Sequence, residues 1–193
     1  EVFYLANIAQ MLDGRKRTER DDIKFDPNYC VPVLKFVVDG EAPDSSLMPT
    51  PTTPLRALAP LPDLRNLTRR TFRFDKADMG GEQRWVINGK LFDHNRIEAS
   101  VKRDRPELWT FVNEGGGWSH PNHGHQEEAR IISRDGRPAQ GEDVSRIDVI
   151  TNRPGESVTF YRNFRDYTGK YVVHCHNLAH EDHAMMFGWE IKP

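Results

Sequence analysis

The stretch that decides both the fold and the chemistry of this chain is Tyr171-Val172-Val173-His174-Cys175-His176. An aromatic residue followed by two β-branched residues favours a β-strand, in which consecutive side chains point to opposite faces. On such a strand His174 and His176 share one face, and Cys175 points to the other. We therefore expect two different metal environments, one on each side of this strand.

A second group of histidines lies upstream, in His120-Pro121-Asn122-His123-Gly124-His125. If side chains alternate here as well, His123 and His125 share a face, and His120, at odd separation from both, takes the other. The two motifs together then predict two sets of ligands: His120 with Cys175, and His123 and His125 with His174 and His176.

The set around Cys175 gains two ligands from the residues that follow the strand. His180 and Met185 bring it to two imidazoles, one thiolate and a distant thioether, which is the ligand set of a blue-copper electron-transfer site. Zinc is the main alternative, but a structural zinc site closes with four tight ligands and has no use for a long, weak methionine bond. The four imidazoles of the other set also suit copper.

These two motifs resemble those of the multicopper oxidases, a family that includes laccases, bilirubin oxidases and spore-coat laccases. The resemblance rests on His-Pro-x-His-x-His at 120–125 and His-Cys-His-x-x-x-His-x-x-x-x-Met at 174–185, and a weaker likeness covers most of residues 66–193. The run from His180 to Met186 looks most like the bilirubin oxidase and spore-coat laccase branch. The family's fold is three cupredoxin domains, of which this chain would hold the end of the second and the whole of the third.

The resemblance implies a role for each ligand. The mononuclear blue copper would be held by His120, Cys175, His180 and Met185. In the trinuclear cluster, His123 would bind the lone copper, and the coupled pair would be bound by His125, His174 and His176. The family's other four cluster ligands come from two His-x-His motifs, which His94 and His183 do not form. We therefore expect the chain to hold the blue copper and to need an amino-terminal chain or domains for a working cluster.

The reaction implied by the resemblance is one-electron oxidation of a phenolic or similar small organic reductant, coupled to four-electron reduction of dioxygen to water. We expect electrons to enter through an exposed edge of His180 and to pass through Cys175 to its covalent neighbours. Glu181 is a candidate proton relay, and an ordinary surface or ligand-supporting carboxylate is an equally good reading of it.

Two alternative functions stay open. A blue-copper electron carrier would use the first ligand set only and would leave four histidines without a role, and copper stoichiometry separates it from an oxidase. A metal-ion oxidase of the same fold would act on cuprous or manganous ions. The methionine-rich stretches expected of a copper-resistance protein are missing from a chain with 5 methionines.

Several neighbouring side chains have a plainer reading. We expect His183 to be a loop residue, Met186 to pack in the core, His94 to be structural or solvated, and Trp118 to be a core aromatic rather than a wall of the copper pocket. For Glu127 and Glu128 the sequence does not separate ligand orientation from simple solvation.

Short apolar or alternating runs, separated by turn signals such as Asn88-Gly89 and Pro154-Gly155, recur through the second half of the chain. Such runs predict an antiparallel sandwich or barrel, and the family resemblance makes this an all-β, cupredoxin-like Greek-key β-sandwich. The expected strands are 70–74, 84–87, 108–113, 129–133, 146–151, 157–162, 171–174 and 187–191. No long helical period is present.

The chain divides into three predicted parts. Residues 1–40, with strands expected at 2–9 and 31–38, are assigned to the end of a preceding cupredoxin domain; 41–65 are a proline-rich connector; and 66–193 are the copper-binding cupredoxin domain. The charged cluster at 15–22 mixes basic and acidic residues, so we expect a solvated loop.

The composition of the chain disfavours some classes of binding partner. The 193 residues carry a formal net charge of −2, which does not favour nucleic acid or an anionic membrane surface as a partner. With only Cys30 and Cys175, no disulfide framework is expected, and Cys30 is read as a buried or incidental thiol, or as a bridge to a missing chain. A start without methionine suggests a processed product or a fragment. The family resemblance suggests a secreted, periplasmic or spore-coat protein whose signal is not in this chain.

Overall fold

The computed structural model describes residues 1–7, 9–11, 23–25, 30–40, 45–53 and 57–193. The chain forms two compact units, Glu1–Ala59 and Pro60–Pro193. The division lies within the predicted connector, while the assignment of residues 1–40 to a preceding cupredoxin domain stays a prediction. The charged cluster at 15–22 lies outside the described residues.

Within the described residues of the first unit, the strands form two antiparallel pairs. β1 (Val2–Asn7) pairs with β4 (Val31–Val37), and β2 (Ala9–Met11) pairs with β3 (Ile23–Phe25). The apolar side chains of β1 and β4 are largely exposed. Cys30 is free and exposed, so the expectation of a buried thiol is wrong, and the two other readings, an incidental thiol or a bridge to a missing chain, stay predictions.

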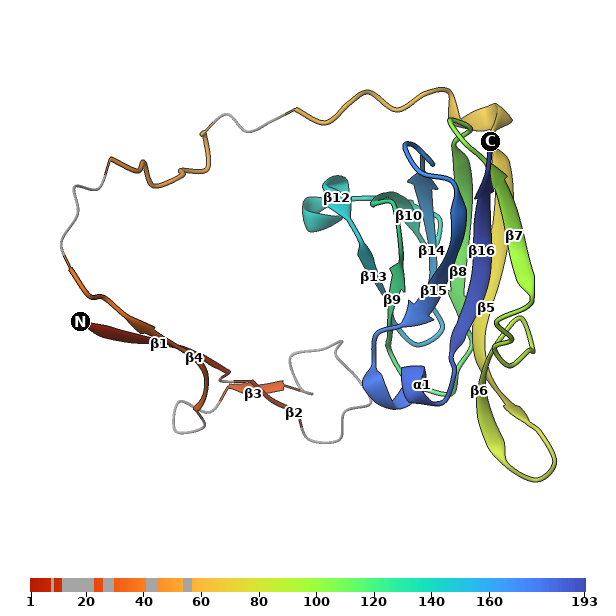
Figure 1. Cartoon of the computed structure of the whole chain (residues 1–193), viewed down its shortest axis with the longest axis horizontal. Helices are drawn as coiled ribbons and strands as arrows, with labels where there is room; N and C mark the ends of the chain where they lie inside the picture. Colours follow the sequence, from red (N-terminus) through yellow and green to blue (C-terminus); the bar gives the residue numbers. More distant parts are fainter. Residues whose placement is uncertain (8, 12–22, 26–29, 41–44, 54–56) are drawn as a thin grey trace. The chain divides into compact units, whose positions relative to one another are not determined.

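The second unit is a β-sandwich whose two sheets face each other (Figure 1). One sheet has the strand order β11-β10-β14-β8-β5-β6, with β12 beside β10. Its strands are β5 (Thr68–Asp78), β6 (Gln83–Ile87), β8 (Glu107–Asn113), β10 (Ala129–Arg134), β11 (Arg137–Pro138), β12 (Arg146–Ile147) and β14 (Ser157–Arg162).

The other sheet has the order β13-β9-β15-β16-β7. Its strands are β7 (Ile97–Lys102), β9 (His120–Gly124), β13 (Val149–Asn152), β15 (Gly169–Cys175) and β16 (Met186–Lys192). Short 3-10 turns occur at Leu64–Asn66 (η1) and Gly141–Val144 (η2), and the helix α1 (Leu178–Asp182) joins β15 to β16. None of the described helices could cross a membrane.

The predicted all-β sandwich is confirmed, with three differences. Two neighbouring pairs, β5 with β8 and β7 with β16, are parallel, so the expectation of a purely antiparallel sheet is wrong for them. The strand expected at 146–151 is two strands in different sheets, β12 and β13. The strands β7, β9 and β11 and the helix α1 are not among the expected elements, although the alternation assumed for the histidines at 120–125 agrees with β9.

Aromatic side chains lock the two sheets together. Phe72 of β5 stacks on Phe187 of β16 with ring centroids 4.2 Å apart, and Trp109 of β8 meets Trp189 of β16 edge-on at 5.5 Å. Aromatic pairs of this kind add about 0.5–1.5 kcal/mol each beyond the burial of their area. The packing therefore fixes β16, and through its pairing with β15 it fixes the strand that carries Cys175.

Candidate metal centres

The register between β9 and β15 decides which histidines meet. His123 lies opposite His174, so their side chains leave the sheet on the same face. Asn122 lies opposite Cys175, and His120, two residues before Asn122, shares its face. The separation into two sets that the sequence predicts therefore agrees with the strand pairing.

His120, Cys175 and His180, here called the buried group, converge on one point. The Nδ1 atoms of His120 and His180 lie 3.1 Å apart. The Sγ atom of Cys175 lies 3.5 Å from Nδ1 of His120 and 3.4 Å from Nδ1 of His180. These distances define a point about 1.9 Å from all three atoms, close to a metal–nitrogen bond of about 2.0 Å. One sulfur and two nitrogens so arranged fit a single soft metal ion such as copper.

Burial sets the protonation of the buried group. It lowers the pKa of His120 to about 3 and of His180 to about 4, with smaller contributions from nearby positive charge, so both imidazoles are neutral near pH 7. Burial also raises the pKa of the Cys175 thiol to about 12, so the thiol keeps its proton in the metal-free protein. Binding a metal ion at the sulfur would release that proton.

Met185 is tied to the buried group through the backbone. The Cys175 N–H donates to the Met185 carbonyl at 3.0 Å, and the Met185 N–H donates to the His180 carbonyl at 3.0 Å. The Met185 side chain is fully buried in the core. The loop after β15 thus holds Met185 and His180 in a fixed relation to Cys175, and the role of Met185 as a distant, weak ligand stays a proposal.

The expectation of an exposed His180 edge is wrong, because the side chain is only 1% exposed. The ring of Trp85 lies 3.9 Å from the His180 ring, and Trp118 meets His180 edge-on at 5.1 Å. The Nζ atom of Lys76 sits 4.2 Å above Trp85. Trp118 packs against the core, as expected, and it also lies beside the candidate copper pocket. Trp85 and Lys76 went unpredicted because they come from the hairpin of β5 and β6, in the opposite sheet.

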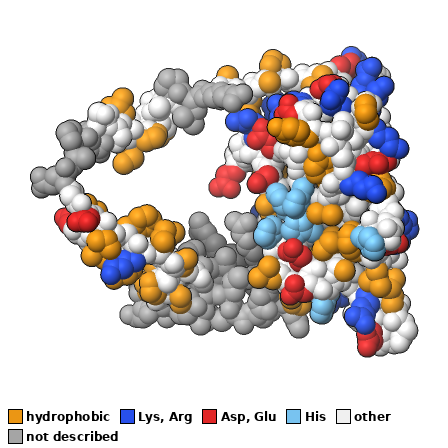
Figure 2. Space-filling view, viewed as in Figure 1, with side chains coloured by type: hydrophobic (Ala, Val, Ile, Leu, Met, Phe, Trp, Pro, Cys, Tyr) orange, Lys and Arg blue, Asp and Glu red, His pale blue; other side chains and the backbone are white. Residues whose placement is uncertain are grey.

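The second set, here called the outer group, comprises His123, His125, His174 and His176. The potential ligand atoms of the first three lie within 4.8 Å of one another, and the Nε2 atoms of His125 and His174 are 3.2 Å apart. The His176 ring lies 5.2 Å from the His174 ring and 5.8 Å from the His123 ring, outside that triad. Figure 2 shows histidine side chains gathered on one face of the sandwich.

Hydrogen bonds and burial prepare the outer group for a metal ion. Nδ1 of His123 lies 3.1 Å from the backbone carbonyl of Asp148; donation to this carbonyl leaves Nε2 free as a ligand. Burial, together with the neighbouring histidines, lowers the pKa of His125, and burial lowers the pKa of His174. Both effects favour the neutral, metal-binding form of the imidazole.

Glu181, in the helix α1, lies next to the outer group. Its Oε2 atom is 3.4 Å from Nδ1 of His174, and its side chain is half-buried. His183 is exposed, and Met186 is half-buried rather than part of the core. His94 is exposed and lines, together with His125, a cavity of about 300 Å³.

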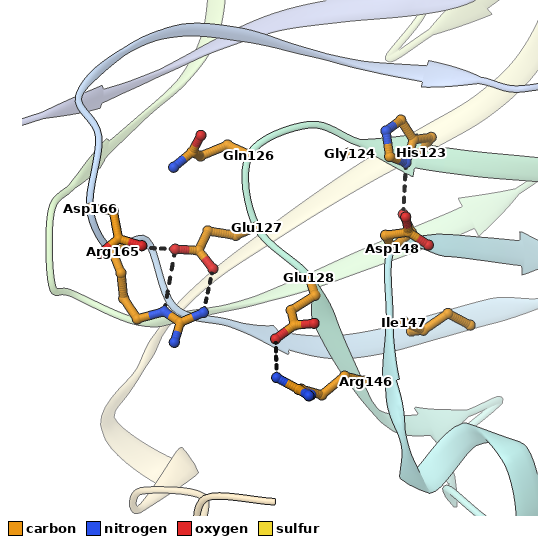
Figure 3. A pocket seen from close by; sticks show the side chains of 10 residues that line it. All are labelled: His123, Gly124, Gln126, Glu127, Glu128, Arg146, Ile147, Asp148, Arg165 and Asp166. Atoms are coloured by element: carbon orange, nitrogen blue, oxygen red, sulfur yellow. Dashed lines mark hydrogen bonds and ion pairs between the residues drawn. The ribbon is translucent and has the colours of Figure 1, made fainter. Parts of the chain in front are cut away.

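A second, polar cavity of about 440 Å³ lies beside His123 (Figure 3). The carboxylate of Glu127 is buried in its wall and pairs with Arg165 at 2.9 Å, and Glu128 pairs with Arg146 at 2.9 Å. Both acidic residues therefore have basic partners and do not simply face water. Glu127 fixes the loop that leaves the outer group.

Comparisons with known proteins identify the family of this chain. A profile of the family described as multicopper oxidase matches residues 58–193. The chain is 36% identical over 162 residues to a bilirubin oxidase of Albifimbria verrucaria, covering 80% of this chain and 27% of that protein. It is 37% identical over 110 residues to a multicopper oxidase of Staphylococcus aureus, covering 55% of this chain and 24% of that protein.

Among solved structures, a laccase of Pediococcus acidilactici matches with a TM-score of 0.64 at 27% identity, covering 89% of this chain and 35% of the other. A multicopper oxidase of Campylobacter jejuni matches with a TM-score of 0.64 at 24% identity, covering 91% of this chain and 39% of the other, and supports the fold. The chain spans about a quarter of the length of the two curated relatives described above.

Proposed function

Because the chain belongs to the multicopper oxidase family, we propose that it supplies the blue-copper site and part of the oxygen-reducing site of a laccase-like oxidase. The proposed reaction takes single electrons from a phenolic or similar organic reductant and reduces dioxygen to water. The observation that carries the proposal is that His174 and Cys175, adjacent in β15, belong to different ligand groups.

The donor atoms fit the copper cofactor of the family. In the proposed assignment the mononuclear copper would be held by His120, Cys175, His180 and Met185. The four imidazoles of the outer group would serve the shared cluster: His123 for the lone copper, and His125, His174 and His176 for the coupled pair. When bound to this mixed sulfur and nitrogen set, copper supplies one-electron transfer.

The chain's own residues connect and shield the two groups. Cys175 is covalently bonded to both His174 and His176, so an electron that leaves the buried group has a short route through the backbone to the outer group. Trp85 and Trp118 cover His180 and exclude water from the buried group. In this proposal the reductant approaches the half-buried Trp118 and not His180 itself.

Glu181 is proposed to hold and pass on protons beside the outer group. The contact of its carboxylate with His174 supports this role and equally fits a carboxylate that only orients the ring. Substitution by glutamine separates the two readings. Glutamine still offers a hydrogen-bond partner but no titratable group, so oxygen reduction slows only if Glu181 carries protons.

The proposed partner is an amino-terminal chain or set of domains that contributes four more histidines. Its support is the short span of this chain relative to its relatives, and the partly exposed outer group. A blue-copper electron carrier would leave the closely spaced imidazoles of His123, His125 and His174 unexplained. Copper analysis with the partner present separates the two functions, because a carrier holds one copper per chain and an oxidase holds more.

The test of the proposed function is Cys175→Ser, with Cys30→Ser as the matched control because Cys30 is free and exposed. The Cys175→Ser protein should fold but lose the intense blue colour and, in the complete enzyme, all oxidation of phenols coupled to oxygen consumption. The Cys30→Ser protein should keep both. A folded Cys175→Ser protein that stays blue would refute the proposal.

A further inference from the structure

A buried arginine lies directly behind the outer group. Arg162 is the last residue of β14, in the sheet opposite the histidines, and is 2% exposed. Its guanidinium carbon lies 5.7 Å from the ring centroids of both Trp109 and Trp189. Burying a charged group costs stability unless hydrogen bonds compensate, yet Nε and Nη1 find no hydrogen-bond partner in the described part of the chain. Core packing alone does not explain a guanidinium here.

The remaining nitrogen of Arg162 binds the backbone that carries two of the histidines. Nη2 donates to the carbonyl oxygen of Gly124 at 2.6 Å and to that of Glu127. Gly124 stands between His123 and His125. The guanidinium therefore reaches across the sandwich and holds both ends of the turn that leaves β9.

Gly124 makes room for this contact. A Cβ atom at Gly124 would lie 2.4 Å from Nη1, 2.5 Å from Nη2 and 2.8 Å from Cζ of Arg162. The backbone of Gly124 is not in the left-handed region, so its conformation does not demand glycine. Glycine is required here because the Arg162 guanidinium occupies the space that a side chain would need. The position of the Arg162 side chain therefore depends on glycine at position 124.

The same turn is held by other contacts. The Arg165 backbone N–H donates to the Glu127 carboxylate at 2.8 Å, and the Arg165 guanidinium binds it as well (Figure 3). On the opposite side, the His125 N–H donates to the Val172 carbonyl at 3.1 Å. The hydrogen bonds from Arg162 to the Gly124 and Glu127 carbonyls add to these contacts and further restrict the backbone of residues 123–127.

We infer that Arg162 is a positioning residue that sets the spacing of the metal-binding atoms of His123 and His125 by holding the carbonyl groups of Gly124 and Glu127. The inference deepens the proposed function, since it concerns the outer group. The hydrogen bonds described for Arg162 go to the backbone of the outer group, and none of its described contacts involves His120, Cys175 or His180, so we expect the outer group to respond more strongly than the buried group. Loss of such a supporting partner typically lowers metal affinity about 10- to 100-fold.

The first experiment needs no metal. Arg162→Met removes the charge and the donors at similar volume, and hydrogen exchange is measured at the His125 amide in the copper-free chain. The matched control is Arg70→Met, because Arg70 also bridges the sheets, binding Glu107 and the Ser100 carbonyl, without contacting a histidine. Arg162→Met should accelerate hydrogen exchange at the His125 amide more than at core amides of β8. Arg70→Met should not produce this selective acceleration at His125.

The second experiment measures metal binding. The chain is first given one equivalent of Cu²⁺ and then titrated with a second, with calorimetry for affinity and electron paramagnetic resonance to separate imidazole-bound from thiolate-bound copper. Arg162→Met should weaken the second binding event about tenfold or more and leave the blue absorption unchanged. Arg162→Lys should recover part of the loss, since it restores a charged donor of shorter reach.

The outcomes separate this inference from the proposed function. A folded Arg162→Met chain with parental affinity for the second copper and parental His125 exchange would overturn the inference and leave the proposed function intact. An absent second binding event in the parent chain would also overturn it. If the parent never turns blue but the outer group responds to Arg162, the proposed function fails and the inference stands.

Should Arg162→Met not fold, Gly124→Ala tests the same contact from the other side. The added methyl group must displace the guanidinium, so the second copper should again bind about tenfold more weakly while the blue site persists. Parental affinity in a folded Gly124→Ala chain would count against the inference.

Discussion

Acid should destabilise the metal-free second unit through His120 and His180. Both imidazoles are buried and neutral, with pKa values of about 3 and about 4 in the folded chain, against an ordinary value of 6.5. Because the unfolded chain binds more protons below pH 6.5, folding stability is lost as the pH falls from 6.5 toward these folded values. Above pH 6.5 the two residues have no such effect.

The stability lost at pH 5 depends little on the pKa values of His120 and His180 in the folded chain, because both values lie below pH 5. In the unfolded chain, an imidazole of pKa 6.5 is protonated about 30:1 at pH 5, so each buried histidine lowers the free energy of unfolding by about 2 kcal/mol. Together the two residues should lower the free energy of unfolding by about 4 kcal/mol between pH 8 and pH 5. That is a large share of a typical stability of about 5–15 kcal/mol.

The assay is urea unfolding of the copper-free chain at pH 8 and at pH 5. In His120→Asn, the loss on acidification should shrink by about 2 kcal/mol relative to the parent, and His180→Asn should behave alike. His94→Asn is the matched control, since His94 is exposed, and should lose as much stability as the parent. Equal losses in the parent and in both buried-histidine variants would refute the reasoning.

Three further predictions concern single positions. Met185→Leu should change the free energy of unfolding in urea by less than about 1.5 kcal/mol. In a redox titration it should raise the reduction potential of the bound blue copper, because the proposed weak thioether ligand would be lost. An unchanged potential would contradict the ligand role of Met185. Lys76→Met should lower that potential by about 20–40 mV, because an ammonium group near His120 and His180 favours the reduced ion, whereas Lys76→Arg should not. Gly188→Ala should destabilise the second unit by about 1–3 kcal/mol in thermal unfolding, because the added Cβ would lie 2.8 Å from the carbonyl oxygen of Arg96. Parental stability would show that the backbone just before β7 moves without a measurable cost.

The parts of the site that sequence predicts are those governed by local geometry. Alternation along β15 puts Cys175 and His174 on different faces, and odd spacing puts His120 with Cys175, because strand geometry repeats every two residues regardless of what packs on it. The all-β fold follows from the same short-range patterns of apolar residues and turns.

The parts that sequence does not predict depend on contacts between distant segments. The parallel pairing of β5 with β8, and of β7 with β16, is decided by how the sheets assemble and leaves no local pattern. Trp85 reaches the His180 ring from the opposite sheet, which is why the expectation of an exposed His180 edge was wrong. Arg162 likewise reads as an ordinary strand residue until the fold brings it behind Gly124.

The central claim is that neighbouring residues of β15 serve two separate metal centres. Anomalous diffraction at the copper edge, from crystals of the chain loaded with excess Cu²⁺, tests it most directly. The account predicts one copper bound by Cys175, His120 and His180, and separate density among His123, His125 and His174. A single copper bound by both Cys175 and His174 would contradict it.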